Sequence, residues 1–134
     1  MVRARDRIRR VNLLLFTLRW LAAIQVAGVL FQAVCAGQFL AGFEDAVRLH
    51  EVGGWTILAL SIVQLAGAIL LTVRARGTMW IPLCGAAILL SNALQVGTGY
   101  GRFPSVHVPL GVLVFGVAFI QAALLFREPS GRIP

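Results

Sequence analysis

Four apolar stretches follow one another along the chain, and each is long enough to cross a membrane. They cover about residues 20–41, 51–73, 79–98 and 106–126. A transmembrane helix needs about 20 mostly apolar residues. The segments between the stretches are short and rich in glycine and arginine, namely "GFEDAVRLH", "RARGT" and "GYGRFPS". The pattern predicts an all-α protein whose residues 1–134 form a single transmembrane four-helix bundle.

Polar residues recur at one spacing within these stretches. His50 and His107 begin the second and fourth stretches, 57 residues apart, in a chain that is 59% hydrophobic. The same spacing separates Gln38 from Gln95, Gln64 from Gln121, Gly28 from Gly85, and Gly54 from Gly111. Shared spacing of rare polar residues predicts two tandem two-helix repeats, about 20–73 and 79–126. Copies with two spans each have the same orientation, so both histidines are predicted at one depth.

The positive charge is distributed unevenly along the chain. The formal net charge is +7, and all twelve basic residues are arginines. Ten lie in the N-terminal segment, the loop after the second stretch and the C-terminal segment, whereas only Arg48 and Arg102 lie in the other two loops. This bias predicts a multi-pass protein with both termini in the cytoplasm, and the arginine-only basic set with abundant alanine and glycine predicts a bacterial plasma membrane. We expect the charge to contact anionic membrane lipid, and we expect no nucleic-acid partner.

The two histidines are candidate axial ligands of a haem iron. Two imidazoles facing each other inside an apolar four-helix bundle suit the two axial positions of the metal. Gly54 and Gly111 each lie one helical turn beyond a histidine, where the missing side chain would let a flat ring approach the backbone. The histidines and glycines together predict a haem b site near the outer face of the membrane.

Arg48 and Arg102 are the basic residues on the side of the predicted haem, and they are candidates to pair with its propionates. Ordinary extension of both side chains toward the membrane surface explains them equally well. Zinc or copper fits this region less well because either metal needs further ligands. The outer half offers only Cys35, Glu44, Asp45 and Glu51, without a metal-ligand spacing.

Several amide side chains lie deeper in the predicted spans. Gln64 and Gln121 each follow their histidine by close to four helical turns and share its face. A quinol could dock near the haem edge or beside Gln25, Gln32, Gln64 and Asn92. Hydrogen bonding between helices is the favoured explanation of these amides.

The stretch "LQVGTGYGRFPSVHVPLG", residues 94–111, resembles the third-to-fourth helix region of the haem A synthase family. Gln95, Gly99 and the Val106–His107 pair match that pattern, and His50 stands where the second-helix ligand would be. The resemblance implies one four-helix half of such a protein, with bis-histidine haem. The chain is also similar to small four-span bacterial membrane proteins of unassigned function.

Two departures from the family pattern bear on activity. Val47 stands where the oxidising half of the family has a glutamate, and the loop "GFEDAVRLH" lacks the cysteine pair of many members. Haem A synthase activity is therefore not expected. The protein is expected to transfer electrons rather than to be a catalyst.

The favoured function is that of a membrane b-type cytochrome that transfers single electrons, alone, as a subunit of a redox complex, or with quinol. Two alternatives stay open: a haem carrier or sensor, and a cofactor-free scaffold or transporter. The chain shows no broken helix or buried carboxylate that would favour a transporter. Glycines on several helices also raise the hypothesis of a homo-oligomer.

Overall fold

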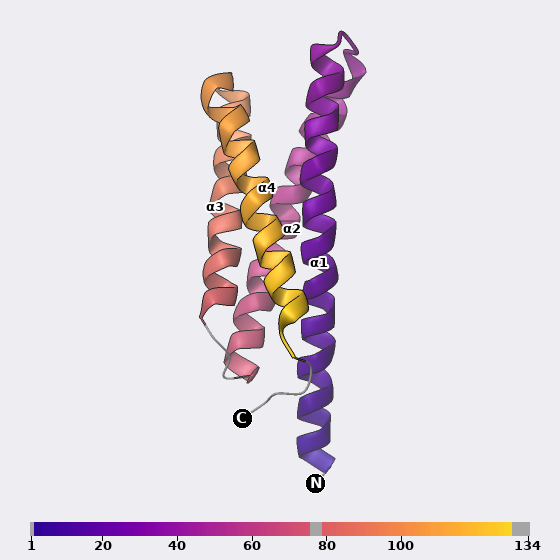
Figure 1. Ribbon diagram of the computed structural model, residues 1–134, viewed down its shortest axis with the longest axis vertical. Coiled ribbons are helices and arrows are strands. Elements are labelled where there is room, and N and C mark those ends of the chain that lie inside the picture. The colour runs from indigo at the N-terminus through magenta and orange to yellow at the C-terminus, as the bar shows by residue number, and fades with distance from the viewer. Residues whose placement is uncertain (1, 76–78, 130–134) are drawn as a thin grey trace.

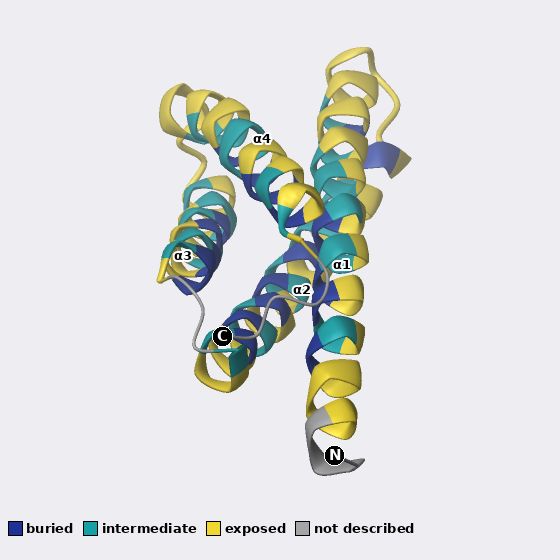
Figure 2. Ribbon diagram, turned by 60° about the horizontal axis from the view of Figure 1, so that its bottom comes forward, coloured by how far each residue is buried: buried dark blue, intermediate teal, exposed yellow. Residues whose placement is uncertain are grey.

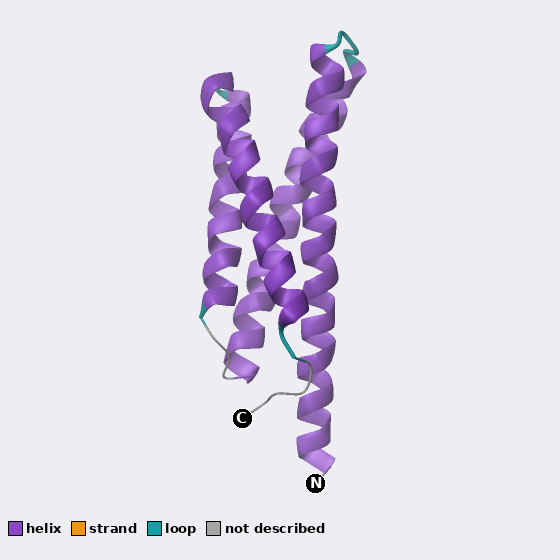
Figure 3. Cartoon of the chain, viewed as in Figure 1, coloured by secondary structure: helices purple, strands orange, loops and turns teal. Residues whose placement is uncertain are grey.

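The computed structural model describes residues 2–75 and 79–129. It contains α1 (Val2–Leu40), α2 (Asp45–Ala75), α3 (Trp80–Tyr100) and α4 (Pro104–Arg127), and the described residues form no strand (Figure 3). All four helices are long and apolar enough to cross a membrane. The predicted all-α four-helix architecture and its membrane-spanning character are confirmed.

The helices form a ring in which each contacts two neighbours. α1 packs against α2 and α4, and α3 packs against the same two helices, so α2 and α4 face each other diagonally. α1 begins and α4 ends at one end of the bundle, here called the terminal end (Figure 1). The α1–α2 and α3–α4 connections lie at the opposite end, called the loop end, toward which the two hairpins diverge.

Two helices begin earlier than the apolar pattern predicts. α1 begins at Val2 instead of about residue 20, because arginine is a good helix former and the helix continues past its apolar part. α2 begins at Asp45 instead of residue 51, with an acidic side chain in its first turn, where the helix dipole favours negative charge. His50 consequently lies in the second turn of α2.

The bundle interior is apolar toward the terminal end. Its main cluster of buried side chains comprises Val11, Leu15, Leu18, Ala22, Ala68, Leu71, Ile81, Ala122 and Leu125. Many large apolar residues are instead exposed, and the exposed residues lie on the outward sides of the helices (Figure 2). Exposed apolar surface of this extent is a feature of proteins in contact with lipid.

Arg19 joins the start of the apolar part of α1 to the end of α4. Its Nε donates to the carbonyl oxygen of Leu125 at 2.9 Å, and its Nη2 donates to the carbonyl oxygen of Glu128. The last carbonyls of a helix lack partners inside the helix and carry its negative dipole end. The half-buried Arg19 guanidinium therefore caps the C-terminus of α4 within the membrane-spanning bundle.

Candidate functional site

The structure brings His50 of α2 and His107 of α4 together across the centre of the bundle. Their ring centroids lie 5.8 Å apart, with an angle of 61° between the ring planes. Both side chains are half-buried. Since α2 and α4 are diagonal neighbours, the two imidazoles meet in the space that all four helices enclose.

Each imidazole is held by its Nδ1 atom. His50 Nδ1 donates to the main-chain carbonyl oxygen of Gln32 at 3.1 Å, and His107 Nδ1 donates to that of Gln95 at 3.0 Å. Thr98 Oγ1 also lies 3.3 Å from His107 Nδ1. A carbonyl oxygen only accepts, so the proton of each neutral ring is on Nδ1 and the lone pair is on Nε2. This is the tautomer in which Nε2 can bind a metal.

Gly53 and Gly111 each leave room for a glutamine side chain from a neighbouring helix. A Cβ atom on Gly111 would lie 2.7 Å from Gln95 Nε2, and one on Gly53 would collide with Gln32 Nε2. The Gln95 side chain occupies the space beside Gly111, and the approach of a flat ring to Gly111 stays a prediction. At Gly54 an added Cβ would meet only Gln32 Oε1, at 3.9 Å, and this glycine lines a cavity.

Gln32 of α1, and not Gln38, takes the position in the first hairpin that Gln95 has in the second. Gln38 is exposed. Gln32 accepts a hydrogen bond from His50 at its main-chain carbonyl oxygen, as Gln95 does from His107. The side chains of Gln32 and Gln95 also each lie beside a glycine. The 57-residue spacing thus relates the two histidines but not the residues that hold them. The tandem repeat stays a prediction.

A cavity of about 680 Å³ opens beside the histidines and is lined by all four helices. Its volume falls within the range of about 300–1,000 Å³ for small-molecule sites. Most of the lining is apolar, and its polar members include both histidines, Gln32, Asn92 and Gln95. Gln32 Nε2 and Gln95 Oε1 are buried without a hydrogen-bond partner among the described residues. Buried polar atoms of this kind call for a ligand or water.

Three side chains form a hydrogen-bonded chain at the rim of this cavity. Trp55 Nε1 donates to the Tyr100 hydroxyl at 3.0 Å, and that hydroxyl donates to the Glu51 carboxylate. Trp55 and Tyr100 are exposed, as membrane-interface residues are expected to be. Glu51, which helix geometry predicts to point away from the face of His50, nevertheless reaches the cavity because the rim extends around α2.

The two arginines of the loop end differ in position. Arg102 is exposed and lines the cavity, with a backbone φ of 55° in the turn before α4. Arg48 is exposed and does not line the cavity. Only Arg102 is therefore within reach of a ligand in the cavity, and propionate pairing by either residue stays a prediction.

The separation of the two imidazoles can be compared with the separation that a haem iron would need. Two imidazoles that share one metal ion have ring centres about 6 Å apart, because each metal–nitrogen bond is about 2 Å long. The observed 5.8 Å matches that separation. Among residues 2–75 and 79–129, no group of three or more histidine, cysteine, aspartate or glutamate side chains could hold a metal ion. A six-coordinate haem needs only two protein ligands.

Three of the four amides named above, those of Gln25, Gln64 and Asn92, are hydrogen-bonded between helices as expected, whereas Gln32 Nε2 has no partner among the described residues. Gln25 Nε2 and Asn92 Nδ2 donate to Ser61 Oγ at 3.0 and 2.8 Å, and Gln64 Nε2 donates to Gln121 Oε1 at 2.6 Å. Of these hydrogen-bonded residues, only Asn92 lines the cavity. The network lies beneath the histidine site and supports it.

No protein-family model matches the chain, and neither the curated proteins nor the solved structures contain a match.

Proposed function

We propose that this protein is a membrane b-type cytochrome that binds one haem between His50 and His107 and transfers single electrons. The observation that carries the proposal is the paired imidazoles, 5.8 Å apart, each with its Nδ1 donating to a main-chain carbonyl. Both Nε2 lone pairs are thereby free to act as ligands. An ordinary contact between two histidines would not require the same tautomer on both rings.

The chain's own residues would define the chemistry of the site. A bound haem supplies an iron that accepts and releases one electron. His50 and His107 would hold the iron, and a haem held by two imidazoles suits electron transfer rather than binding of oxygen or substrate. The apolar cavity wall, which includes Val29, Val96 and Val114, would exclude water from a group bound there. The Gln32 and Gln95 carbonyls fix the ring orientations.

The charge pattern supports an orientation with the loop end outward. Arginines concentrate at the terminal end, which the positive-inside rule assigns to the cytoplasm of a bacterium. The haem would then lie toward the outer face, where Arg102 is available to a propionate. Fusion of a reporter enzyme to the loop between α1 and α2 tests this topology, and activity of a cytoplasm-only reporter there would contradict it.

The electron donor or acceptor would dock at the cavity rim. A redox protein reaches the haem edge at the exposed loop end, as a subunit of a complex would. A quinol must release protons together with electrons, and the Glu51 carboxylate at the rim is an available acceptor. The rate at which a short-chain quinol reduces the haem distinguishes a quinol from a redox protein as the electron donor. Slow reduction in the wild type, unchanged in Glu51→Gln, would exclude the quinol.

One observation favours a haem carrier as the second candidate. Both histidines are half-buried and the cavity reaches the residues of the rim, so a bound haem would have a route out. Transfer of haem to apomyoglobin within seconds would indicate a carrier, whereas retention over hours would indicate a cytochrome. The transporter alternative is less well supported, because the apolar cluster around Leu18, Leu71 and Leu125 closes the bundle toward the terminal end.

The decisive test of haem binding uses protein purified from cells supplied with a haem precursor. Oxidised and dithionite-reduced spectra are recorded for the wild type, His50→Ala and His107→Ala. Gln38→Ala serves as the control because Gln38 is exposed on α1 near the same end. We expect about one low-spin haem per chain in the wild type and control, and loss of the low-spin spectrum in both histidine variants. A colourless wild-type protein would contradict the proposal.

A further inference from the structure

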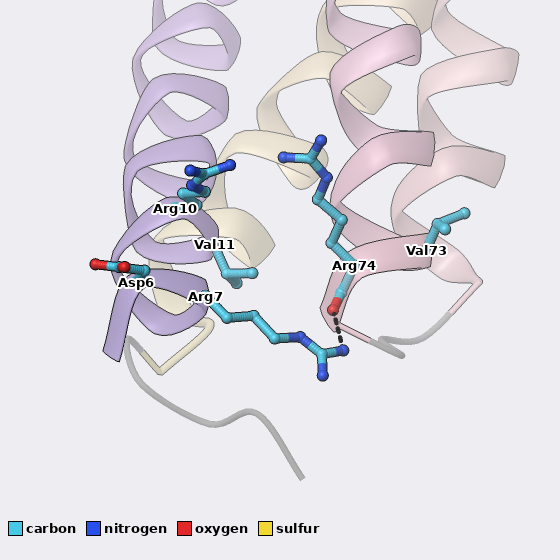
Figure 4. Close-up of a pocket in the computed structure, with 6 residues that line it drawn as sticks. All are labelled: Asp6, Arg7, Arg10, Val11, Val73 and Arg74. Atoms are coloured by element: carbon cyan, nitrogen blue, oxygen red, sulfur yellow. Dashed lines mark hydrogen bonds between the residues drawn. The ribbon is translucent and has the colours of Figure 1, made fainter. Parts of the chain in front are cut away.

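A second cavity lies at the terminal end, between α1 and α2 (Figure 4). Its volume is about 530 Å³. Arginine is its main polar lining, and the lining residues are Asp6, Arg7, Arg10, Val11, Val73 and Arg74. This arginine cleft is separated from the histidine site by the apolar core cluster.

Three arginines from two helices line the arginine cleft. Arg7 Nη2 donates to the main-chain carbonyl oxygen of Arg74 at 2.9 Å and so links α1 to the last turn of α2. The Arg74 guanidinium points away from that hydrogen bond toward the level of Arg10, whereas the Asp6 carboxylate points to the far side of α1 (Figure 4). Neither the Arg10 nor the Arg74 guanidinium has a hydrogen bond or ion pair within the described part of the chain.

Arginines that line one cleft carry like charges, and an anion bound between them offsets their repulsion. Guanidinium groups bind phosphate oxygens through paired hydrogen bonds, which a convergent set of arginines can supply from several sides. Basic pockets between transmembrane helices on the cytoplasmic side are sites for lipid head groups. The arginine cleft is such a basic pocket, since it lies between the helices α1 and α2 and three arginines line it.

We propose that the arginine cleft binds the phosphate of an anionic membrane phospholipid. The source is a lipid rather than free phosphate because the cleft lies where the apolar part of the bundle ends and the arginine-rich part begins. Val11 and Val73 line it, and Leu70, about one helical turn before Arg74, is exposed on the same face of α2 toward the loop end. A phosphate between Arg10 and Arg74 would place its acyl chains along that surface. The proposal does not depend on haem binding.

The test is a titration of the detergent-purified full-length protein with dioctanoyl phosphatidylglycerol, followed by native mass spectrometry. The cleft variant is Arg10→Gln/Arg74→Gln. The matched control is Arg9→Gln/Arg127→Gln, which removes two exposed arginines from the same end but outside the cleft. Dioctanoyl phosphatidylcholine and inorganic phosphate are titrated in parallel. Circular dichroism of both variants verifies that each is folded.

We expect one phosphatidylglycerol per chain in the wild type and the control, and binding at least about tenfold weaker in the cleft variant. Phosphatidylcholine is expected to bind more weakly than phosphatidylglycerol because it has no net negative charge. Equal weakening in the two variants would overturn the proposal, since general charge attraction would then explain binding. Displacement of the lipid by millimolar inorganic phosphate would also overturn it, since the cleft would then select a free anion.

Discussion

Gln64 of α2 donates to Gln121 of α4 at 2.6 Å, and both side chains are 1% exposed. The two residues lie 57 positions apart, as His50 and His107 do, and both pairs meet across the centre of the bundle. A contact between a residue and its counterpart at the same spacing is what a two-fold axis along the membrane normal produces. The repeat itself stays a prediction.

The Gln64–Gln121 bond is expected to contribute modestly to stability. Gln64→Ala alone leaves a buried amide without its partner, at a cost of about 1–3 kcal/mol in the free energy of unfolding. The double variant Gln64→Leu/Gln121→Leu removes both amides. It should lose less free energy of unfolding than the two single leucine variants lose together. Unfolding in mixed micelles measures the coupling, for which about 0.6 kcal/mol is typical inside membranes. Strict additivity would show that the bond contributes nothing.

Gly99 gives the His107 ring its space. An added Cβ at this position would lie 3.2 Å from the ring Cε1 and 3.4 Å from Nδ1, whereas at Gly97 it would meet nothing within 4 Å. Gly99→Ala should therefore tilt the imidazole and weaken haem binding on the order of tenfold, as loss of ligand orientation does elsewhere. Gly97→Ala on the same helix should leave haem affinity unchanged. Equal affinities in the two variants, measured by haem titration, would refute this role.

Tyr100 joins α3 to α2 at the rim through Trp55 and Glu51. Tyr100→Phe removes both hydrogen bonds and keeps the ring, so haem should leave the cavity severalfold faster. Stability should fall by no more than about 1 kcal/mol, since the bonds are exposed to water or head groups. Transfer to apomyoglobin measures the rate, with Phe103→Leu as a rim control without a lost hydrogen bond. An unchanged rate would mean that the rim does not govern release.

Arg19→Ala should destabilise the end of α4. The guanidinium donates to the carbonyl oxygens of Leu125 and Glu128, and a hydrogen bond from a charged group contributes about 1.5–3 kcal/mol. We expect a loss of about 2 kcal/mol in the free energy of unfolding, with partial recovery in Arg19→Lys. Arg9→Ala, at an exposed position of the same helix, is the control. A similar loss in Arg9→Ala would point to general charge effects instead.

The four helices could be predicted because apolar length alone defines a membrane span. The helix starts could not, because polar segments continue α1 and α2 beyond the membrane-length stretch. Arginine and aspartate at those positions favour helix, and the apolar pattern carries no information on them.

The histidine pair had the clearest sequence signal in the candidate site. The only two histidines of the chain are 57 residues apart, and two pairs of glutamines have the same spacing. Its supports were not predictable in the same way. The pairing of Gln32 with His50 depends on how far the α1–α2 hairpin extends, and an ungapped spacing selects Gln38 instead. The contacts of Gly53 and Gly111 likewise follow from where glutamine side chains from another helix come to rest.

The most direct test of the central claim is chemical rescue of a single ligand. His107→Gly is purified with haem, and its ferric electron paramagnetic resonance spectrum is recorded before and after addition of free imidazole. If His107 is an axial ligand opposite His50, the variant should be high-spin, and imidazole should restore the low-spin signal of the wild type. A low-spin spectrum in His107→Gly without imidazole, identical to that of the wild type, would contradict bis-histidine ligation by this pair.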